Sequence, residues 1–110
     1  KKDKLNIVKK FAKVHNVILL LKGHRTIITD GEKVYINTTG DPAMANGGMG
    51  DALTGIISSL IAQGYNLLDS ACFGAYIHGY IGDKLSKERF CVTAKDIIEY
   101  LPIYMKEFQK

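Results

Sequence analysis

The sequence has no tryptophan, only two cysteines and two prolines, and no apolar run longer than the five residues Val17–Leu21. A membrane-spanning helix needs roughly 20 apolar residues, and we recognise no signal peptide. Cys72 and Cys91 lack the spacing of a metal site, so we expect two reduced, buried thiols. These absences favour a cytoplasmic protein, although a disulfide between the two cysteines stays open.

Charge of one sign is not concentrated either. The 110 residues include 15 lysines and arginines against 11 aspartates and glutamates, which gives a net charge of +4. The basic residues form no long run and are not interleaved with aromatic residues, as they are in proteins that read nucleic acids. The charge favours a small anionic ligand, and we expect no nucleic-acid or membrane partner. A chain of this length is at most one domain.

Apolar residues at helical spacing predict about four helices. We expect them over Lys1–Lys13, from a glycine-rich loop to about Gly64, from Leu67 past Gly82, and over Ala94–Tyr100. Asn66 and Thr93, each three residues before an aspartate, are the predicted N-caps of the last two. Pro102 either ends the last helix or kinks it into Ile103–Phe108. The third helix carries small residues that predict a close approach of another helix or of backbone: Ala71, Ala75, Gly79 and Gly82.

Three segments have the composition of strands. The continuous apolar run Val17–Leu21 predicts a strand buried on both faces, as in a parallel sheet covered by helices. Two short β-rich runs, Thr26–Thr29 and Lys33–Asn37, flank an Asp-Gly pair and predict an exposed hairpin. A single buried strand cannot make the sheet that its own pattern requires. This chain therefore either pairs with another chain or is one portion of a larger α/β domain.

The stretch Asn37–Gly55 is the most unusual part of the sequence, because it holds five of the 11 glycines. A glycine-rich loop that opens into a helix presents unpaired N–H groups at the positive end of the helix dipole, where an anion such as phosphate binds. The stretch matches neither GxxxxGK[ST] nor GxGxxG. Asp51 begins the helix, and two interpretations stay open. It either stabilises the helix through the dipole or accepts a proton in phosphoryl transfer.

A second polar group follows the apolar run directly, in the segment Lys22–Thr26. Open α/β sheets bind ligands beyond the carboxyl ends of their strands. These residues are therefore either an ordinary solvated loop or the second wall of the same anion site. His78 is more simply interpreted as a structural histidine, and Tyr65, Tyr76 and Tyr80 as packing residues.

Separated motifs of this sequence, LLKGHRT, NTTGDPAMANGGMGDALTGIISSLIAQG, AYIHGYIGD and AKDIIEYLP, occur in the order of a known family. The chain resembles the ADP-dependent NAD(P)H-hydrate dehydratases of the ribokinase-like superfamily. The resemblance implies a three-layer α/β/α fold with a small β-hairpin. Residues 1–110 would form the C-terminal portion of that single domain, and its N-terminal half would be absent here.

The resemblance also implies an activity and a set of site residues. Hydrated NADH or NADPH would be returned to NAD(P)H by phosphoryl transfer from ADP or ATP, with Mg²⁺, and by loss of phosphate. Asp51 would contact the hydrated nicotinamide and act as the general base. No residue is assigned to a metal. The nucleotide would be bound by Lys22, Gly23, His24, Arg25, Thr26, Gly47, Gly48 and Gly50.

One departure from the superfamily pattern bears on the choice of activity. Many ribokinase-like kinases have a Gly-Thr-Gly-Asp turn, whereas this chain has Met49 in place of the threonine. The difference argues against a sugar or vitamin kinase. A kinase of hydroxymethylpyrimidine or thiazole type and a non-catalytic nucleotide-binding module stay as alternatives. A homo-oligomer and an epimerase domain fused upstream also stay open.

Overall fold

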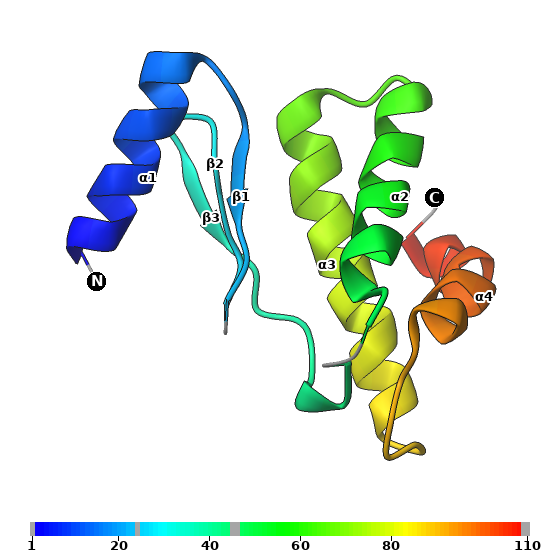
Figure 1. Ribbon diagram of the computed structural model, residues 1–110. Helices are drawn as coiled ribbons and strands as arrows, with labels where there is room; N and C mark the ends of the chain where they lie inside the picture. Colours follow the sequence, from blue (N-terminus) through cyan, green and yellow to red (C-terminus); the bar gives the residue numbers. More distant parts are fainter. Residues whose placement is uncertain (1, 24, 45–46, 109–110) are drawn as a thin grey trace.

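The computed structural model of the protein describes residues 2–23, 25–44 and 47–108. A small sheet lies between one helix on one side and a pair of helices on the other, which gives three layers (Figure 1). The helices are α1 (Lys2–His15), α2 (Met49–Ala62), α3 (Leu67–Ser86), α4 (Ala94–Met105) and the short 3-10 helices η1 (Pro42–Met44) and η2 (Lys106–Phe108). α1 packs on β1 and β2, whereas α2, α3 and α4 pack on one another.

The sheet has three antiparallel strands in the order β1 (Leu19–Leu21), β2 (Ile27–Thr29) and β3 (Val34–Ile36). The predicted hairpin is confirmed as β2 and β3, with Thr29 opposite Val34. Its turn is shaped by the Asp30 carboxylate, which accepts hydrogen bonds of 2.8 Å from two backbone N–H groups in the turn. Gly31 takes a φ of +99°, a left-handed conformation that favours glycine.

The prediction for the apolar run was wrong about its position in the sheet. β1 lies at the edge of the described sheet, pairs antiparallel with β2, and is only half-buried. The central strand is β2, in which Ile28 and Thr29 are buried, so the hairpin is not peripheral. An apolar run predicts only that its residues tend to be buried, and not which strand of a sheet they form. Which strand is covered depends on packing against α1 and α3, which lie on opposite sides of β2 (Figure 1).

The predicted helices are present, and their capping signals are confirmed. The Asn66 side chain accepts a 2.7 Å hydrogen bond from the Asp69 N–H, and Thr93 forms a capping box with Asp96. Pro102 lies inside α4, which continues to Met105 rather than ending before the proline. Cys91 is exposed, so the prediction of a buried thiol is wrong there.

Small residues of α3 allow the close contacts that the sequence predicts. A Cβ on Gly74 would lie 2.6 Å from Cγ1 of Ile57 in α2. A Cβ on Gly79 would lie 2.6 Å from the backbone carbon of Thr39, which belongs to the segment that follows β3. Real Cβ atoms do not approach so closely, and α3 therefore packs directly on α2 and on that segment.

Candidate functional site

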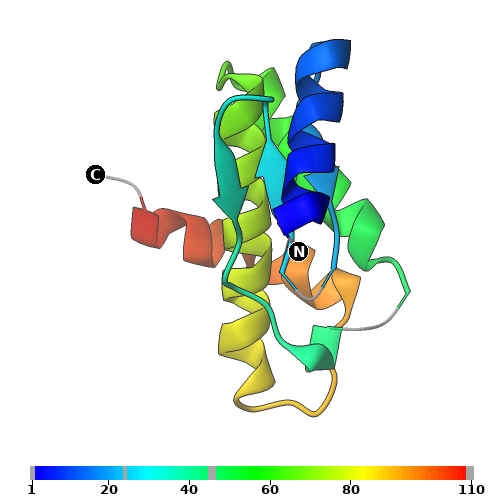
Figure 2. The same ribbon diagram turned by 90° about the vertical axis from the view of Figure 1, so that its left-hand side faces the viewer.

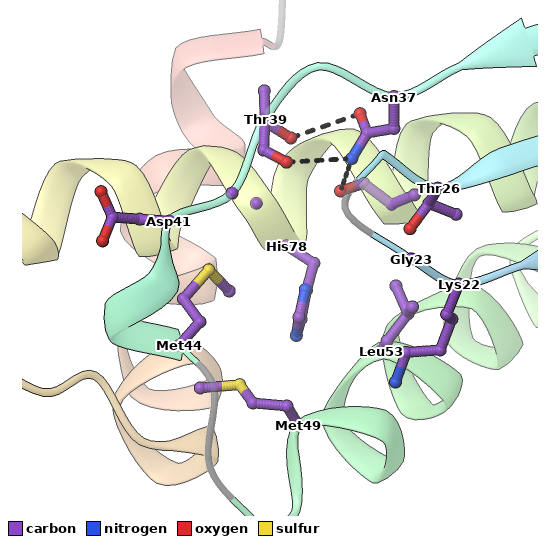
Figure 3. A pocket seen from close by; sticks show the side chains of 13 residues that line it. Lys22, Gly23, Thr26, Asn37, Thr39, Asp41, Met44, Met49, Leu53 and His78 are labelled. Carbon is purple, nitrogen blue, oxygen red and sulfur yellow. Dashed lines mark hydrogen bonds between the residues drawn. The ribbon is translucent and has the colours of Figure 1, made fainter.

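The loop after β1, the segment after β3 and the start of α2 lie at the same end of the molecule in both views (Figures 1 and 2). Together with α3 they enclose a cavity of about 510 Å³, which we call the larger cavity. Figure 3 shows the side chains that line it. They are Lys22, Gly23, Thr26, Asn37, Thr39, Gly40, Asp41, Met44, Met49, Leu53, Ala75, His78 and Gly79.

A smaller cavity of about 360 Å³ lies beside the first, and Lys22 and Leu53 line both. Gly50 and Asp51, from the first turn of α2, line only the smaller one. The Nζ atom of Lys22 lies 3.4 Å from the position that a Cβ on Gly50 would occupy. The ammonium group at the end of β1 therefore faces the backbone at the start of α2, and the two predicted walls lie side by side.

The start of α2 has the geometry of an anion site. Gly48 is its N-cap residue, in a left-handed conformation with a φ of +87°, and it offers no side chain to cap the helix. Across this turn the Ala52 N–H donates a hydrogen bond of 3.0 Å to the Gly48 carbonyl. The backbone N–H groups of the helical residues that precede Ala52 have no acceptor within the helix. Together with the helix dipole and Lys22, they favour a bound phosphate.

One wall of the larger cavity is the 37–41 segment, which crosses α3 and is held there by hydrogen bonds. The Asn37 side-chain amide donates to the Ala75 carbonyl at 3.2 Å, and the Thr39 hydroxyl donates to the Tyr76 carbonyl at 2.9 Å. The Gly40 N–H donates to both carboxylate oxygens of Asp83, at 3.1 Å each. The position of this wall is therefore set by α3.

His78 projects from α3 into the larger cavity, where Lys22 also extends (Figure 3). Its Nε2 atom is buried and has no hydrogen-bond partner within the described part of the chain. Burial lowers the pKa of His78 below its usual 6.5, and the Lys22 charge lowers the pKa further. A hydrogen bond with the Met49 backbone acts in the opposite direction. Our sequence interpretation of His78 as a structural residue did not predict that it lines this cavity.

A signal for His78 was present in the sequence. His78 lies three residues after Ala75 and four before Gly82, which places all three on one face of a helix. Small residues around a polar side chain leave space beside it.

The structure brings together part of the predicted site. Lys22, Gly23 and Thr26 line the larger cavity, and Gly50 and Asp51 line the smaller one with Lys22. Arg25, Gly47 and Gly48 are exposed and line neither of these two cavities. His24 lies outside the described residues. The roles of all these residues stay predictions.

Among residues 2–23, 25–44 and 47–108, no group of three or more His, Cys, Asp and Glu side chains is placed to hold a metal ion. Within the same ranges, no helix is long and apolar enough to cross a membrane.

The three layers are those of the ribokinase-like superfamily, and the predicted fold class is confirmed. A ribokinase-like superfamily protein from Enterococcus faecalis superposes with a TM-score of 0.78 and 39% identity, over 87% of this chain and 34% of that one. The NAD(P)H-hydrate dehydratase family matches residues 1–103, and the chain belongs to that family.

Individual relatives agree with this assignment. The chain is 43% identical to the bifunctional NAD(P)H-hydrate repair enzyme Nnr of Moorella thermoacetica, over 98% of this chain and 21% of that protein. The ADP/ATP-dependent NAD(P)H-hydrate dehydratase of Bacillus subtilis, co-crystallised with ATP and Mg²⁺, superposes with a TM-score of 0.89. It is 27% identical and is matched over 98% of this chain and 40% of its own. The chain thus spans well under half the length of these relatives.

Proposed function

We propose that this chain carries the nucleotide-binding and catalytic portion of a nucleotide-dependent NAD(P)H-hydrate dehydratase. Residues 1–110 would be the C-terminal portion of a single ribokinase-like domain, in keeping with the share of its relatives that the chain spans. The observation that carries the proposal is the position of Lys22 against Gly50, one residue before Asp51. A cation, a helix start and a carboxylate meet there, which are the groups that phosphoryl transfer requires.

The reaction assigns one role to each group. Asp51 accepts the proton of the hydroxyl group on the hydrated nicotinamide, and that oxygen attacks the terminal phosphorus of ADP or ATP. The bond from this phosphorus to the nucleotide breaks, and AMP or ADP leaves. The carbon–oxygen bond of the phosphorylated hydrate then breaks as the neighbouring carbon loses a proton, which restores the ring double bond and releases phosphate. Lys22 and the N–H groups of α2 stabilise the charge that develops on the phosphoryl oxygens.

The residues of this site suit a Mg²⁺ ion that binds together with the nucleotide. Magnesium bound with a nucleotide takes its ligands largely from phosphates and water, with one or two carboxylates from the protein. Asp51 lines the smaller cavity beside Lys22 and is exposed, so its carboxylate is available to such an ion. When bound, Mg²⁺ supplies charge neutralisation at the phosphates.

The test is incubation of the complete protein that contains this chain with the hydrate of NADH, ADP or ATP, and Mg²⁺. We expect the absorbance of reduced nicotinamide to recover with both nucleotide and hydrate present, and not with either alone. No recovery, together with phosphorylation of a hydroxymethylpyrimidine or thiazole alcohol, would establish the kinase alternative instead. A homo-oligomer, a fused epimerase domain and a cytoplasmic location stay predictions.

A further inference from the structure

The start of α4 lies against the start of α2, in a contact that the reaction described above does not use. A Cβ on Gly48 would lie 3.3 Å from the Cβ of Ala94, the first residue of α4, so the main chain of the glycine lies directly against the alanine methyl group. Gly48 is the N-cap residue of α2, and its carbonyl accepts the hydrogen bond from the Ala52 N–H. The position of Gly48 therefore sets the direction in which the first N–H groups of α2 point.

A second contact holds the chain at η1, which precedes α2. The Val92 N–H donates a hydrogen bond of 2.9 Å to the carbonyl of Ala43 in η1. The Val92 side chain is fully buried in the core that α2, α3 and α4 share, and such a close-packed residue has little freedom to move. The segment 92–94 therefore contacts the chain both at η1, through Val92, and at the N-cap of α2, through Ala94.

The segment 92–94 is itself held by the first turn of α4. Thr93 forms the capping box with Asp96, whose carboxylate lies 2.9 Å from the Arg89 guanidinium. That guanidinium also lies over the ring of Tyr100, 5.5 Å from its centre. None of these four residues lines the larger or the smaller cavity, so any effect that they have on the anion site is indirect.

We infer that Ala94 is a positioning residue, which fixes through Gly48 the N–H groups of α2 that receive the phosphates of the nucleotide. The inference rests on the proposed function and adds to it a residue of α4, a helix that lines neither of the two cavities. The anion site combines Lys22 at the end of β1 with N–H groups of α2, so its geometry depends on what supports α2. A displacement of about 1 Å between such groups can cost on the order of a hundredfold in rate.

Ala94→Val in the complete protein tests this contact, because the added methyl groups crowd Gly48. Calorimetric titration should show a loss of affinity on the order of tenfold for ADP and an equal loss for inorganic pyrophosphate, since both bind through phosphate. Ala94→Gly removes the supporting methyl group and should show a smaller loss of the same kind, about threefold. In turnover of the hydrate, KM for the nucleotide should rise in both variants, while KM for the hydrate stays unchanged.

The matched control is Ile97→Val in the same helix. Ile97 is fully buried, and shortening it by one carbon destabilises the core without touching Gly48. We expect a lower Tm, with affinities for ADP and pyrophosphate within about twofold of the unsubstituted protein. If the valine variant at position 94 does not fold, the glycine variant decides alone.

Three outcomes would contradict these expectations. An equal loss of affinity in Ile97→Val would show that binding merely follows the stability of α4, which overturns the inference. Unchanged pyrophosphate affinity in the variants of Ala94, or an equal rise of KM for the hydrate, would overturn it as well. Absence of any binding of ADP and pyrophosphate to the unsubstituted protein would instead refute the proposed function.

Discussion

The side chain of Lys22 lies against the backbone of Gly50, with its Nζ atom 3.4 Å from the place of a Cβ on that glycine. This contact joins the end of β1 to the start of α2, two segments separated in the chain by the whole hairpin and the glycine-rich stretch. It places an ammonium group beside the backbone at the start of α2, an arrangement that favours a bound anion.

Gly50→Ala tests this contact without disturbing the fold. The new methyl group would meet only the flexible end of Lys22, and alanine is favoured over glycine in helices by up to about 1 kcal/mol. We expect an unchanged or slightly higher Tm and a loss of ADP affinity on the order of tenfold. The matched control is Gly55→Ala in the same helix, where a Cβ would meet nothing within 4 Å. Equal ADP affinity in the two variants would show that the contact has no part in binding.

Asp51→Asn tests the general base. Asp51 is exposed, and its substitution by an uncharged group of the same shape should cost at most about 1 kcal/mol through the helix dipole. We expect ADP to bind within a few-fold of the original affinity, while turnover of the hydrate falls at least about a hundredfold. Asp69→Asn is the control, because Asp69 is also an acidic residue in a first helical turn. Full turnover in Asp51→Asn would exclude the carboxylate as the base.

Gly79→Ala tests the packing of α3 against the 37–41 segment. The added Cβ would lie 2.6 Å from the Thr39 backbone carbon and 2.8 Å from the Gly40 nitrogen, so backbone must move. We expect a destabilisation of about 1–3 kcal/mol in chemical denaturation, together with a higher KM for the nucleotide. Gly55→Ala again serves for comparison. A variant as stable as the original protein would mean that the segment is not held against α3 in solution.

The lowered pKa of His78 predicts a dependence of stability on pH. In the unfolded chain the imidazole titrates near its usual 6.5, whereas in the folded protein the pKa is lower. Between these two values the unfolded state binds more protons, so the free energy of unfolding decreases as the pH falls below about 6.5. We expect the free energy of unfolding to decrease between pH 7.5 and pH 5.5 by less in His78→Gln than in the original protein, because glutamine cannot be protonated. Chemical denaturation at the two pH values measures both decreases. Identical losses in the two proteins would indicate that His78 is protonated in the fold.

Local features of the fold could be predicted from the sequence because their partners are near in the chain. The Asn66 cap and the Thr93–Asp96 capping box each join residues three positions apart. The hairpin turn likewise depends on Asp30 and its next few neighbours. The central position of β2 and the exposure of Cys91 could not be predicted, since they depend on how distant elements cover them.

The same distinction applies to the candidate site. Lys22 and Asp51 were singled out by motifs whose chemistry can be seen within a short stretch of sequence. Asn37 and Asp83 were not, because each acts across an arrangement that only the fold creates. Asn37 is 38 residues from its acceptor Ala75, and Asp83 is 43 residues from its donor Gly40. No pattern within a single helix or loop carries that information.

These sequence separations have a consequence for the order of folding. Contacts between residues close in the chain form early, and those that close long loops form late. The hairpin and α2 depend on local contacts, whereas the 37–41 segment reaches its place only when α3 is present. We therefore expect substitutions in that segment to accelerate unfolding more than they slow folding. We expect the wall of the larger cavity that this segment forms to assemble late as the protein folds and to open early as it unfolds.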